Sequence, residues 1–317
     1  MSTPLSHDPL WPRTGSWSPP TTSERADLAI VGVPTSHTSL SPTNAHLTPA
    51  AIRDALRRYS SHLVAPGSRA NRGTEVEMVL DDVLTIVDGG DARDPDAALG
   101  EQEAAKRISE LSHQSELVIA LGGDNACTVP AMLGIAAAHG GLDSAGLITL
   151  DAHHDLRDGR SNGSPVRRLV EMGLNPAHIV QIGIADFANS RAYRERAKSL
   201  GITVIHRDEL HERPLRDIVV EALEIAGKGA GAIHVDLDVD VCDRSVAPGC
   251  PASVPGGLQA HELRRITRML ACDSRVKGFD IAEVDVTADA PDGRTVRLAA
   301  LLVLEAAAGL ASRLGVS

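Results

Sequence analysis

The sequence predicts an α/β protein in which a parallel β-sheet is covered on both faces by helices. Short runs rich in β-branched residues alternate with longer segments of helical periodicity from Asp27 onward, which is typical of a doubly wound sheet. Neither an internal repeat nor a linker interrupts this pattern. We therefore expect a single domain over residues 26–317, preceded by an arm over residues 1–25 that is rich in Pro, Ser and Thr.

The expected strands and helices alternate strictly along the chain. Short, apolar, β-branched runs predict strands at residues 28–31, 83–87, 117–121, 146–150, 179–182, 203–205, 232–237 and 278–282. Helical periodicity predicts helices at residues 49–60, 100–114, 129–139, 165–173, 191–200, 215–226, 260–270 and 294–314. Ligands of an open parallel sheet bind beyond the carboxyl ends of its strands, so the polar residues after each strand are the first candidates for function.

The charge balance and the aromatic content argue against binding to nucleic acid. The chain has 31 Lys and Arg against 42 Asp and Glu, a formal net charge of −11, and it has two Trp, two Tyr and two Phe. Grooves that follow phosphates need clustered cations, and single-strand platforms need aromatic rings. The core must instead be built from aliphatic residues.

The cysteines and the N-terminal residues indicate a cytoplasmic protein. Cys127, Cys242, Cys250 and Cys272 have no paired short spacing, which favours reduced thiols over disulfides or a zinc site. The first residues lack the cationic start and apolar core of a signal peptide. No apolar run approaches the roughly 18 residues of a spanning helix, so we expect no membrane segment. The N-terminal arm is a candidate flexible segment that drapes over the domain or a partner subunit.

Polar and acidic residues gather after four of the expected strands. They are Asp124 and Asn125 after residues 117–121, Asp151, His153 and Asp155 after 146–150, Asp236, Asp238 and Asp240 around the end of 232–237, and Glu283 and Asp285 after 278–282. So many acids at the ends of apolar strands cost free energy through desolvation and mutual repulsion unless a positive charge lies among them. A pair of divalent metal ions is the natural counter-charge.

The spacing of these acids supports a metal site. Side chains two residues apart on a strand point the same way, so Asp238 and Asp240 share one face, and Asp151, His153 and Asp155 can do the same. A single acid at a strand end is most often a helix cap or turn residue, but the two motifs together favour metal binding. The four carboxylates balance two divalent ions, and oxygen ligands with one imidazole suit Mn²⁺ better than zinc.

The strings GGDNA, DAHHD, DLDVDVCDRSVAPG and AEVD resemble the signature blocks of the ureohydrolase family, which includes arginases, agmatinases and formimidoylglutamases. They occur in the family's order, and the resemblance covers nearly the whole chain from about Asp27. It implies a three-layer α/β/α sandwich with a mainly parallel eight-stranded sheet, in agreement with the number of expected strands. It also implies a homo-oligomer, a trimer or a hexamer.

The resemblance also implies a ligand set. One metal ion would be held by Asp151, His153, Asp238 and Asp240, and the other by Asp151, Asp155, Asp238 and Asn125. The turn that begins at Asp243 sets this register, which leaves Asp236 beside the ligands and not among them.

Two positions depart from the arginase pattern. Asn125 stands where the family usually has a His ligand, and a neutral amide oxygen is the weaker donor. This predicts either a weakly metal-binding, non-catalytic family member or membership of a branch that tolerates Asn, as some formimidoylglutamases do. Asn162 stands where arginases carry a proton-shuttling His, and it is a candidate substrate-binding residue. His154 is expected to pack away from the metals.

Four arginines in the loop after Asp155 predict an anionic substrate. They are Arg157, Arg160, Arg167 and Arg168, and guanidinium groups hold carboxylates through paired hydrogen bonds. Arg157 stands where arginases reach the substrate α-carboxylate, and Arg160 is the next candidate. Arg167 and Arg168 are explained equally well as surface cations. The strings SNGSPVRRLVE and IADFANSRAY resemble the formimidoylglutamase branch.

This resemblance implies hydrolysis of a linear amidine C–N bond, with N-formimidoyl-L-glutamate giving L-glutamate and formamide in histidine degradation. Glu283 is expected to bind the amidine, Asp240 to relay a proton, and His153 to serve as the third catalytic residue. An amidinohydrolase acting on agmatine or on a guanidino acid such as guanidinobutyrate is the alternative enzyme. A non-catalytic binding or regulatory subunit is the alternative outside catalysis.

Overall fold

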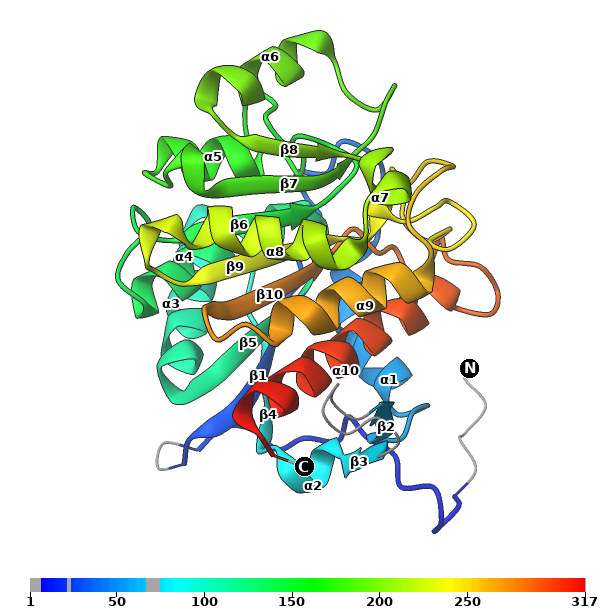
Figure 1. The fold of residues 1–317 in the computed structure, drawn as a ribbon. Helices are drawn as coiled ribbons and strands as arrows, with labels where there is room; N and C mark the ends of the chain where they lie inside the picture. The colour runs from blue at the N-terminus through cyan, green and yellow to red at the C-terminus, as the bar shows by residue number, and fades with distance from the viewer. Residues whose placement is uncertain (1–6, 22–23, 67–74, 317) are drawn as a thin grey trace.

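The computed structural model describes residues 7–21, 24–66 and 75–316. Its centre is an eight-stranded sheet with the order β4-β1-β5-β10-β9-β6-β7-β8, whose paired strands are all parallel (Figure 1). The strands are β1 (Ala26–Val33), β4 (Ile86–Asp91), β5 (Ser115–Gly122), β6 (Gly146–Leu150), β7 (Ile179–Ile184), β8 (Thr203–His206), β9 (Ile233–Asp238) and β10 (Val276–Ala282). The predicted parallel sheet is confirmed.

Helices cover both faces of the sheet, as predicted. One face packs against α1 (Thr48–Leu56), α8 (Leu215–Ala226), α9 (Ala260–Ala271) and α10 (Arg294–Leu314), which share one large aliphatic core with the strands (Figure 1). The other face packs against α3 (Ala98–Gln114), α4 (Thr128–Ala138), α5 (Pro165–Glu171) and α6 (Arg191–Leu200). Because both faces are covered, the central strands are almost wholly buried, and every residue of β6 and of β9 is buried.

From the sequence we expect no apolar run close to the length of a membrane-spanning helix, and helix α10 corrects this. It has 21 residues with a mean hydropathy of 1.6, so by length and composition it is apolar enough to cross a membrane. However, 83% of that apolar window is buried inside the protein. The helix is apolar because it packs against α9 and α1 and its side chains belong to the aliphatic core on this face of the sheet.

The structure also differs from the prediction around residues 80–87. The predicted strand at 83–87 is replaced by a short helix α2 (Leu80–Val83), and β4 begins only at Ile86, where its pairing with β1 starts. Leu80 and Leu84 are buried on one side of this turn, which anchors it as a helix. The structure adds an antiparallel hairpin of β2 (His62–Pro66) and β3 (Glu75–Val79), and a short helix α7 (Glu209–Glu212).

The described part of the N-terminal arm lies against the same chain. The Trp17 indole donates a 2.9 Å hydrogen bond to Asp81, and the Asp88 backbone N–H donates to the Ser18 carbonyl at 2.9 Å. Ser18 forms an isolated parallel bridge with Val87. Residues 1–6 and 22–23, which also belong to the predicted arm, lie outside the described residues.

The order of the strands places the sequence motifs together. Strands β5, β10, β9 and β6 are neighbours at the centre of the sheet, and because they are parallel their carboxyl ends lie at one edge. Each of the four motifs identified in the sequence follows one of these strands. They therefore meet at this edge, where an open α/β sheet binds its ligands.

Candidate metal centre and active site

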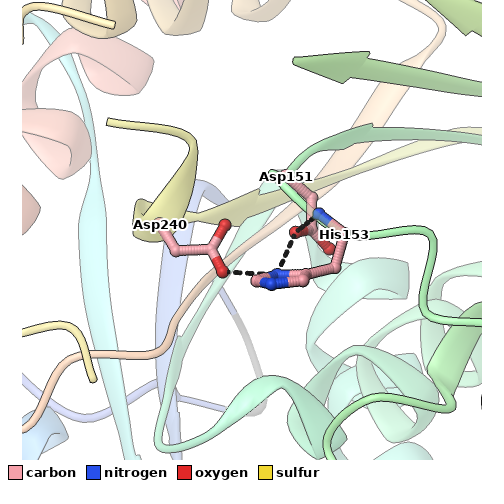
Figure 2. A group of neighbouring side chains, drawn as sticks. All are labelled: Asp151, His153 and Asp240. Carbon is pink, nitrogen blue, oxygen red and sulfur yellow. Dashed lines mark hydrogen bonds and ion pairs between the residues drawn. The ribbon is translucent and has the colours of Figure 1, made fainter. Parts of the chain in front are cut away.

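The predicted ligands after β6 and β9 lie close together and are largely withdrawn from water. Asp151, Asp155, Asp238 and Asp240 are 1%, 6%, 3% and 1% exposed, respectively. His153 Nδ1 lies 2.7 Å from Asp240 Oδ2 and 3.4 Å from Asp151 Oδ1 (Figure 2). Buried carboxylates at this density fit a cation-binding site.

The backbone fixes the direction of these carboxylates. Asp238 caps the 3-10 helix Val239–Val241, where its Oδ1 accepts a 2.8 Å hydrogen bond from the Asp240 N–H. Asp240 Oδ1 accepts from the Ala152 N–H at 2.8 Å, and Asp151 Oδ1 accepts from the His153 N–H at 2.6 Å. One oxygen of each carboxylate is thus held by the main chain. This arrangement preorganises the group, and the second oxygen of Asp240 contacts His153.

The pKa values of these groups record how strongly the site disfavours uncompensated negative charge. Burial and then the charge of Asp240 raise the pKa of Asp151 to about 7. Burial and then the charge of Asp151 raise the pKa of Asp155 well above its ordinary value, and burial and then Asp240 do the same for Asp238. Divalent cations that prefer oxygen ligands would neutralise these carboxylates, so the donor set fits Mn²⁺.

His153 places a positive charge beside the carboxylates of Asp151 and Asp240. Burial alone would lower the pKa of His153, but the charge of Asp240 and hydrogen bonds to Asp151 and Asp240 raise it to about 12. Burial alone would raise the pKa of Asp240, but the charge of His153 outweighs it and lowers the pKa. A metal ion that binds here therefore competes with the proton on His153.

Asn125 reaches the same group of side chains from the end of β5. Its backbone N–H donates a 2.8 Å hydrogen bond to Glu283 Oε1, and its Nδ2 donates to Asp155 Oδ2 at 2.5 Å. Its Oδ1 accepts a 2.8 Å hydrogen bond from the Thr128 hydroxyl. The structure thus brings Asn125 beside Asp155, its partner in the predicted ligand set.

Cys250 is a neighbour of the predicted ligands Asp238 and Asp240. Its sulfur and one carboxylate oxygen each of Asp238 and Asp240 lie within 4.8 Å of one another. Burial and then the charge of Asp240 raise the pKa of the Cys250 thiol well above its ordinary value. The thiol is therefore neutral, and its burial is typical of a cysteine that acts as a small apolar side chain.

Glu283 is held by two donors and by an uncommon backbone conformation. Its Oε1 accepts the Asn125 N–H and also the Asn162 Nδ2, the latter at 2.7 Å. Burial and then the charge of Asp124 raise the pKa of Glu283 to about 7. Glu283 has φ 64° and Asp155 has φ 52°. Backbone strain of this kind costs about 1–3 kcal/mol for each residue and persists only where the surrounding structure holds it, as at many active sites.

A cavity of ≈ 320 Å³ opens over these residues. Its wall includes His153, Asp155, Asp238, Asp240 and Glu283, together with Arg157, Asn162 and Tyr193. The cavity is the size of a site for a small molecule. Predicted metal ligands, the predicted amidine-binding carboxylate and a cation therefore face the same cavity.

Among the four loop arginines, only Arg157 lines this cavity. Its Cζ lies 5.9 Å from the centroid of the Tyr193 ring. A Cβ at position 163 would come within 2.7 Å of Arg157 Cδ, so Gly163 makes room for the arginine side chain. Tyr193 is a site residue that the motifs miss, although it lies in a string that resembles the formimidoylglutamase branch.

The structure does not place Arg160, the second predicted substrate-binding arginine, on the wall of this cavity. Its guanidinium donates instead to the Asp96 carbonyl at 2.9 Å and to Glu101 Oε2 at 3.0 Å. Arg168 donates to the same Glu101 carboxylate at 2.9 and 2.7 Å. Arg167 donates to the carbonyl groups of residues 157 and 159 and to Glu171. These hydrogen bonds hold the loop in place, so the three arginines have a structural role in it.

Two further residues of the motifs lie beside the ligands. The His154 ring bonds through Nδ1 to Gln181 Oε1 at 2.7 Å, and His154 also lines the cavity. Asp236 is fully buried opposite Asp280 in the next strand, and no hydrogen-bond partner of its carboxylate lies within the described residues. Asp236 thus lies further from the carboxyl end of β9 than Asp238 does.

Fold and site together define a three-layer α/β/α protein with a candidate divalent-metal centre beneath a small-molecule cavity. The chain belongs to the arginase family, whose model matches residues 26–309. It is 36% identical over 284 residues to a formimidoylglutamase of Halalkalibacterium halodurans, covering 87% of this chain and 85% of that one.

Solved structures agree with this membership. The crystal structure of formimidoylglutamase from Bacillus subtilis matches with a TM-score of 0.83 and 29% identity, over 96% of this chain and 94% of that one. The structure of Trypanosoma cruzi formiminoglutamase with Mn²⁺ has the same fold, with a TM-score of 0.76 and 21% identity, over 91% of this chain and 94% of that one.

Proposed function

We propose that the protein hydrolyses N-formimidoyl-L-glutamate to L-glutamate and formamide, a C–N hydrolase step in histidine degradation. One observation carries this proposal. The Arg157 guanidinium, which has no hydrogen-bond partner among the described residues, lines the same cavity as Glu283 and the buried acids. A substrate with a carboxylate at one end and a cationic amidine at the other is complementary to this arrangement. Relatives named formimidoylglutamase, up to 36% identical, support it.

We infer that the enzyme uses two divalent ions, most simply Mn²⁺. Asp151, His153, Asp238 and Asp240 would hold one ion, and Asp151, Asp155, Asp238 and Asn125 the other. When bound, such ions lower the pKa of water and so provide a nucleophile at neutral pH. The oxygen-rich donor set and the Mn²⁺ in the structure of the Trypanosoma cruzi protein support this choice of metal.

Protein side chains then position the substrate and move its protons. The Glu283 carboxylate attracts the planar amidine and stabilises positive charge on it, while Asn162 and the Asn125 N–H hold that carboxylate in place. Arg157 binds a substrate carboxylate at the other end of the cavity and so orients the reacting carbon. Asp240, in contact with His153, relays a proton to the departing glutamate nitrogen.

A substrate panel tests this proposal. The Mn²⁺-loaded protein is incubated with N-formimidoyl-L-glutamate, 4-guanidinobutyrate and agmatine, and formamide or urea is measured. We expect the highest kcat/KM with formimidoylglutamate, and the lowest with agmatine because its amine end is repelled by Arg157. A protein that loads two ions but hydrolyses none of the three would contradict the proposal and favour a binding or regulatory role. Preference for guanidinobutyrate would favour an amidinohydrolase.

We further infer a cytoplasmic homo-oligomer. The four cysteines are unpaired in the structure, which is consistent with a reducing compartment. A trimer or hexamer is expected from the family resemblance alone. Light scattering after size-exclusion chromatography tests the oligomeric state, and a monomer would contradict it.

A further inference from the structure

A chain of buried polar side chains leads from Asn125 away from the cavity into the sheet. It runs from Asn125 to Thr128, then to Asp280 of β10 and His234 of β9, and these four residues are at most 1% exposed. Thr128 Oγ1 lies 2.8 Å from Asn125 Oδ1 and 3.2 Å from Asp280 Oδ1, and His234 Nε2 lies 2.6 Å from Asp280 Oδ2. None of these four residues is part of the cavity wall, although Asn125 bonds to Asp155 and Glu283, which are.

The far end of this chain is fixed by the sheet. An ionised carboxylate only accepts hydrogen bonds, so His234 Nε2 is the donor to Asp280. The remaining oxygen of Asp280 needs a donor from the helix side, where the Thr128 hydroxyl and the weaker donor Cys127 Sγ, 3.9 Å away, are placed. A Cβ at Gly278 would come within 2.6 Å of His234 Nδ1, so glycine leaves room for the imidazole.

The Thr128 hydroxyl faces one acceptor too many. It has a single proton but lies within hydrogen-bond distance of both Asn125 Oδ1 and Asp280 Oδ1. The charged carboxylate is the stronger acceptor of the two. When the Asn125 amide oxygen faces Thr128, its Nδ2 donates to Asp155, which is a proposed metal ligand. A cation at Asp155 repels the amide hydrogens, so the amide nitrogen then needs another acceptor.

We propose that Thr128, oriented by Asp280 and through it by His234, is the positioning residue that presents the Asn125 amide oxygen to the metal ion. With the amide turned over, Nδ2 donates to Thr128 and Thr128 donates to Asp280, so the single Thr128 proton no longer has two acceptors. The oxygen then faces Asp155. This explains physically how a neutral amide serves as a ligand here, and it rests on the metal centre proposed above.

Thr128→Val and Thr128→Ser test this role by metal affinity. Mn²⁺ binding to the whole protein is titrated by electron paramagnetic resonance of the free ion, so activity is not needed. Loss of the hydroxyl in Thr128→Val should weaken the more weakly held ion about 10- to 100-fold. Thr128→Ser keeps the hydroxyl and should stay within about threefold of the wild type. Thr267→Val, which removes a buried hydroxyl bonded to Leu263 in the remote helix α9, is the matched control and should bind like the wild type.

The outcomes separate this inference from the metal centre on which it rests. A folded Thr128→Val protein that binds both ions as the wild type does would overturn the inference alone, and so would equal weakening in Thr128→Ser. A wild type that binds no second ion would overturn the metal centre itself. A crystal structure of the Mn²⁺-loaded wild type tests the same proposal without depending on the folding of a variant. An Asn125 nitrogen that contacts Asp155 there, and not Thr128, would contradict the proposal.

Discussion

The Arg157 guanidinium carbon lies 5.9 Å from the centroid of the Tyr193 ring, and the Arg196 carbon lies 5.6 Å from the same centroid. Arg196 is itself fixed, because its Nη1 donates to the Leu156 carbonyl at 2.6 Å and to Asp158 at 2.8 Å. The Tyr193 ring therefore lies against the fixed Arg196, and it steadies Arg157 through its π face. The N–H donors of Arg157 stay available to a substrate carboxylate.

Arg157→Ala should raise the KM for N-formimidoyl-L-glutamate about 10- to 100-fold, because a charge-assisted hydrogen bond contributes about 1.5–3 kcal/mol. Steady-state kinetics of the Mn²⁺-loaded enzyme measure this. Arg160→Ala is the matched control, since Arg160 is paired with Glu101 outside the cavity. An unchanged KM in Arg157→Ala would rule out the carboxylate contact.

Tyr193→Leu should raise the same KM about two- to fivefold without loss of fold, because a partly exposed cation–π contact contributes about 0.5–1 kcal/mol. Tyr193→Phe keeps the ring and should behave as the wild type does. If Phe and Leu have equal effects, the hydroxyl and not the ring matters at this position.

Asn125→His should tighten the binding of the weaker Mn²⁺ ion, because an imidazole nitrogen is a better donor than a neutral amide oxygen. Titration with Mn²⁺ checks this whether or not turnover improves. Weaker binding in Asn125→His would show that the space between Asp155 and Thr128 accepts only the smaller amide.

Glu283→Gln should lower kcat about 10²- to 10³-fold while leaving the fold intact, since the amide oxygen can still accept from Asn125 and Asn162 but the negative charge is lost. Single-turnover measurements with circular dichroism of the variant test this. A variant with normal kcat would remove Glu283 from the mechanism.

Mn²⁺ affinity should rise with pH between about 6 and 8. Burial and then Asp240 raise the pKa of Asp151 to about 7, so below that pH a proton competes with the metal for this carboxylate. His153, with its pKa raised to about 12, must also release a proton on binding. We expect affinity to change about tenfold for each pH unit and each proton displaced. Calorimetry in buffers of different ionisation enthalpy counts these protons, and a flat profile would contradict the ligand set.

Much of the fold could be predicted because most elements bury an apolar run or face of their own. The bounds predicted for β6, α6, α8 and α10 are those of the structure. The position of β10 between β5 and β9 could not be predicted, since strand order depends on contacts between distant segments. The segment 83–87 is β-branched, but buried leucines turn its beginning into a helix.

The candidate site divides in the same way. The spacing predicts that Asp238 and Asp240 lie together, and they do, but not by alternation along a strand: β9 ends at Asp238, and Asp240 lies in the 3-10 helix that Asp238 caps. Arg160 has the same residue type as Arg157 and lies only three positions away, but its partner Glu101 comes from a helix whose position the sequence does not reveal. Thr128 could not be identified for a similar reason, because its partner Asp280 is 152 residues away.

The four motif-bearing strands are neighbours in space but not in sequence, and the Asn125–Glu283 hydrogen bond spans 158 residues. An unfolded chain cannot gather these donors, so metal ions bind the native state almost exclusively. Ions at 100 times their Kd would then stabilise the native state by about 2.7 kcal/mol for each site. The metal supply of the cell would therefore govern how long this protein persists as well as how fast it works.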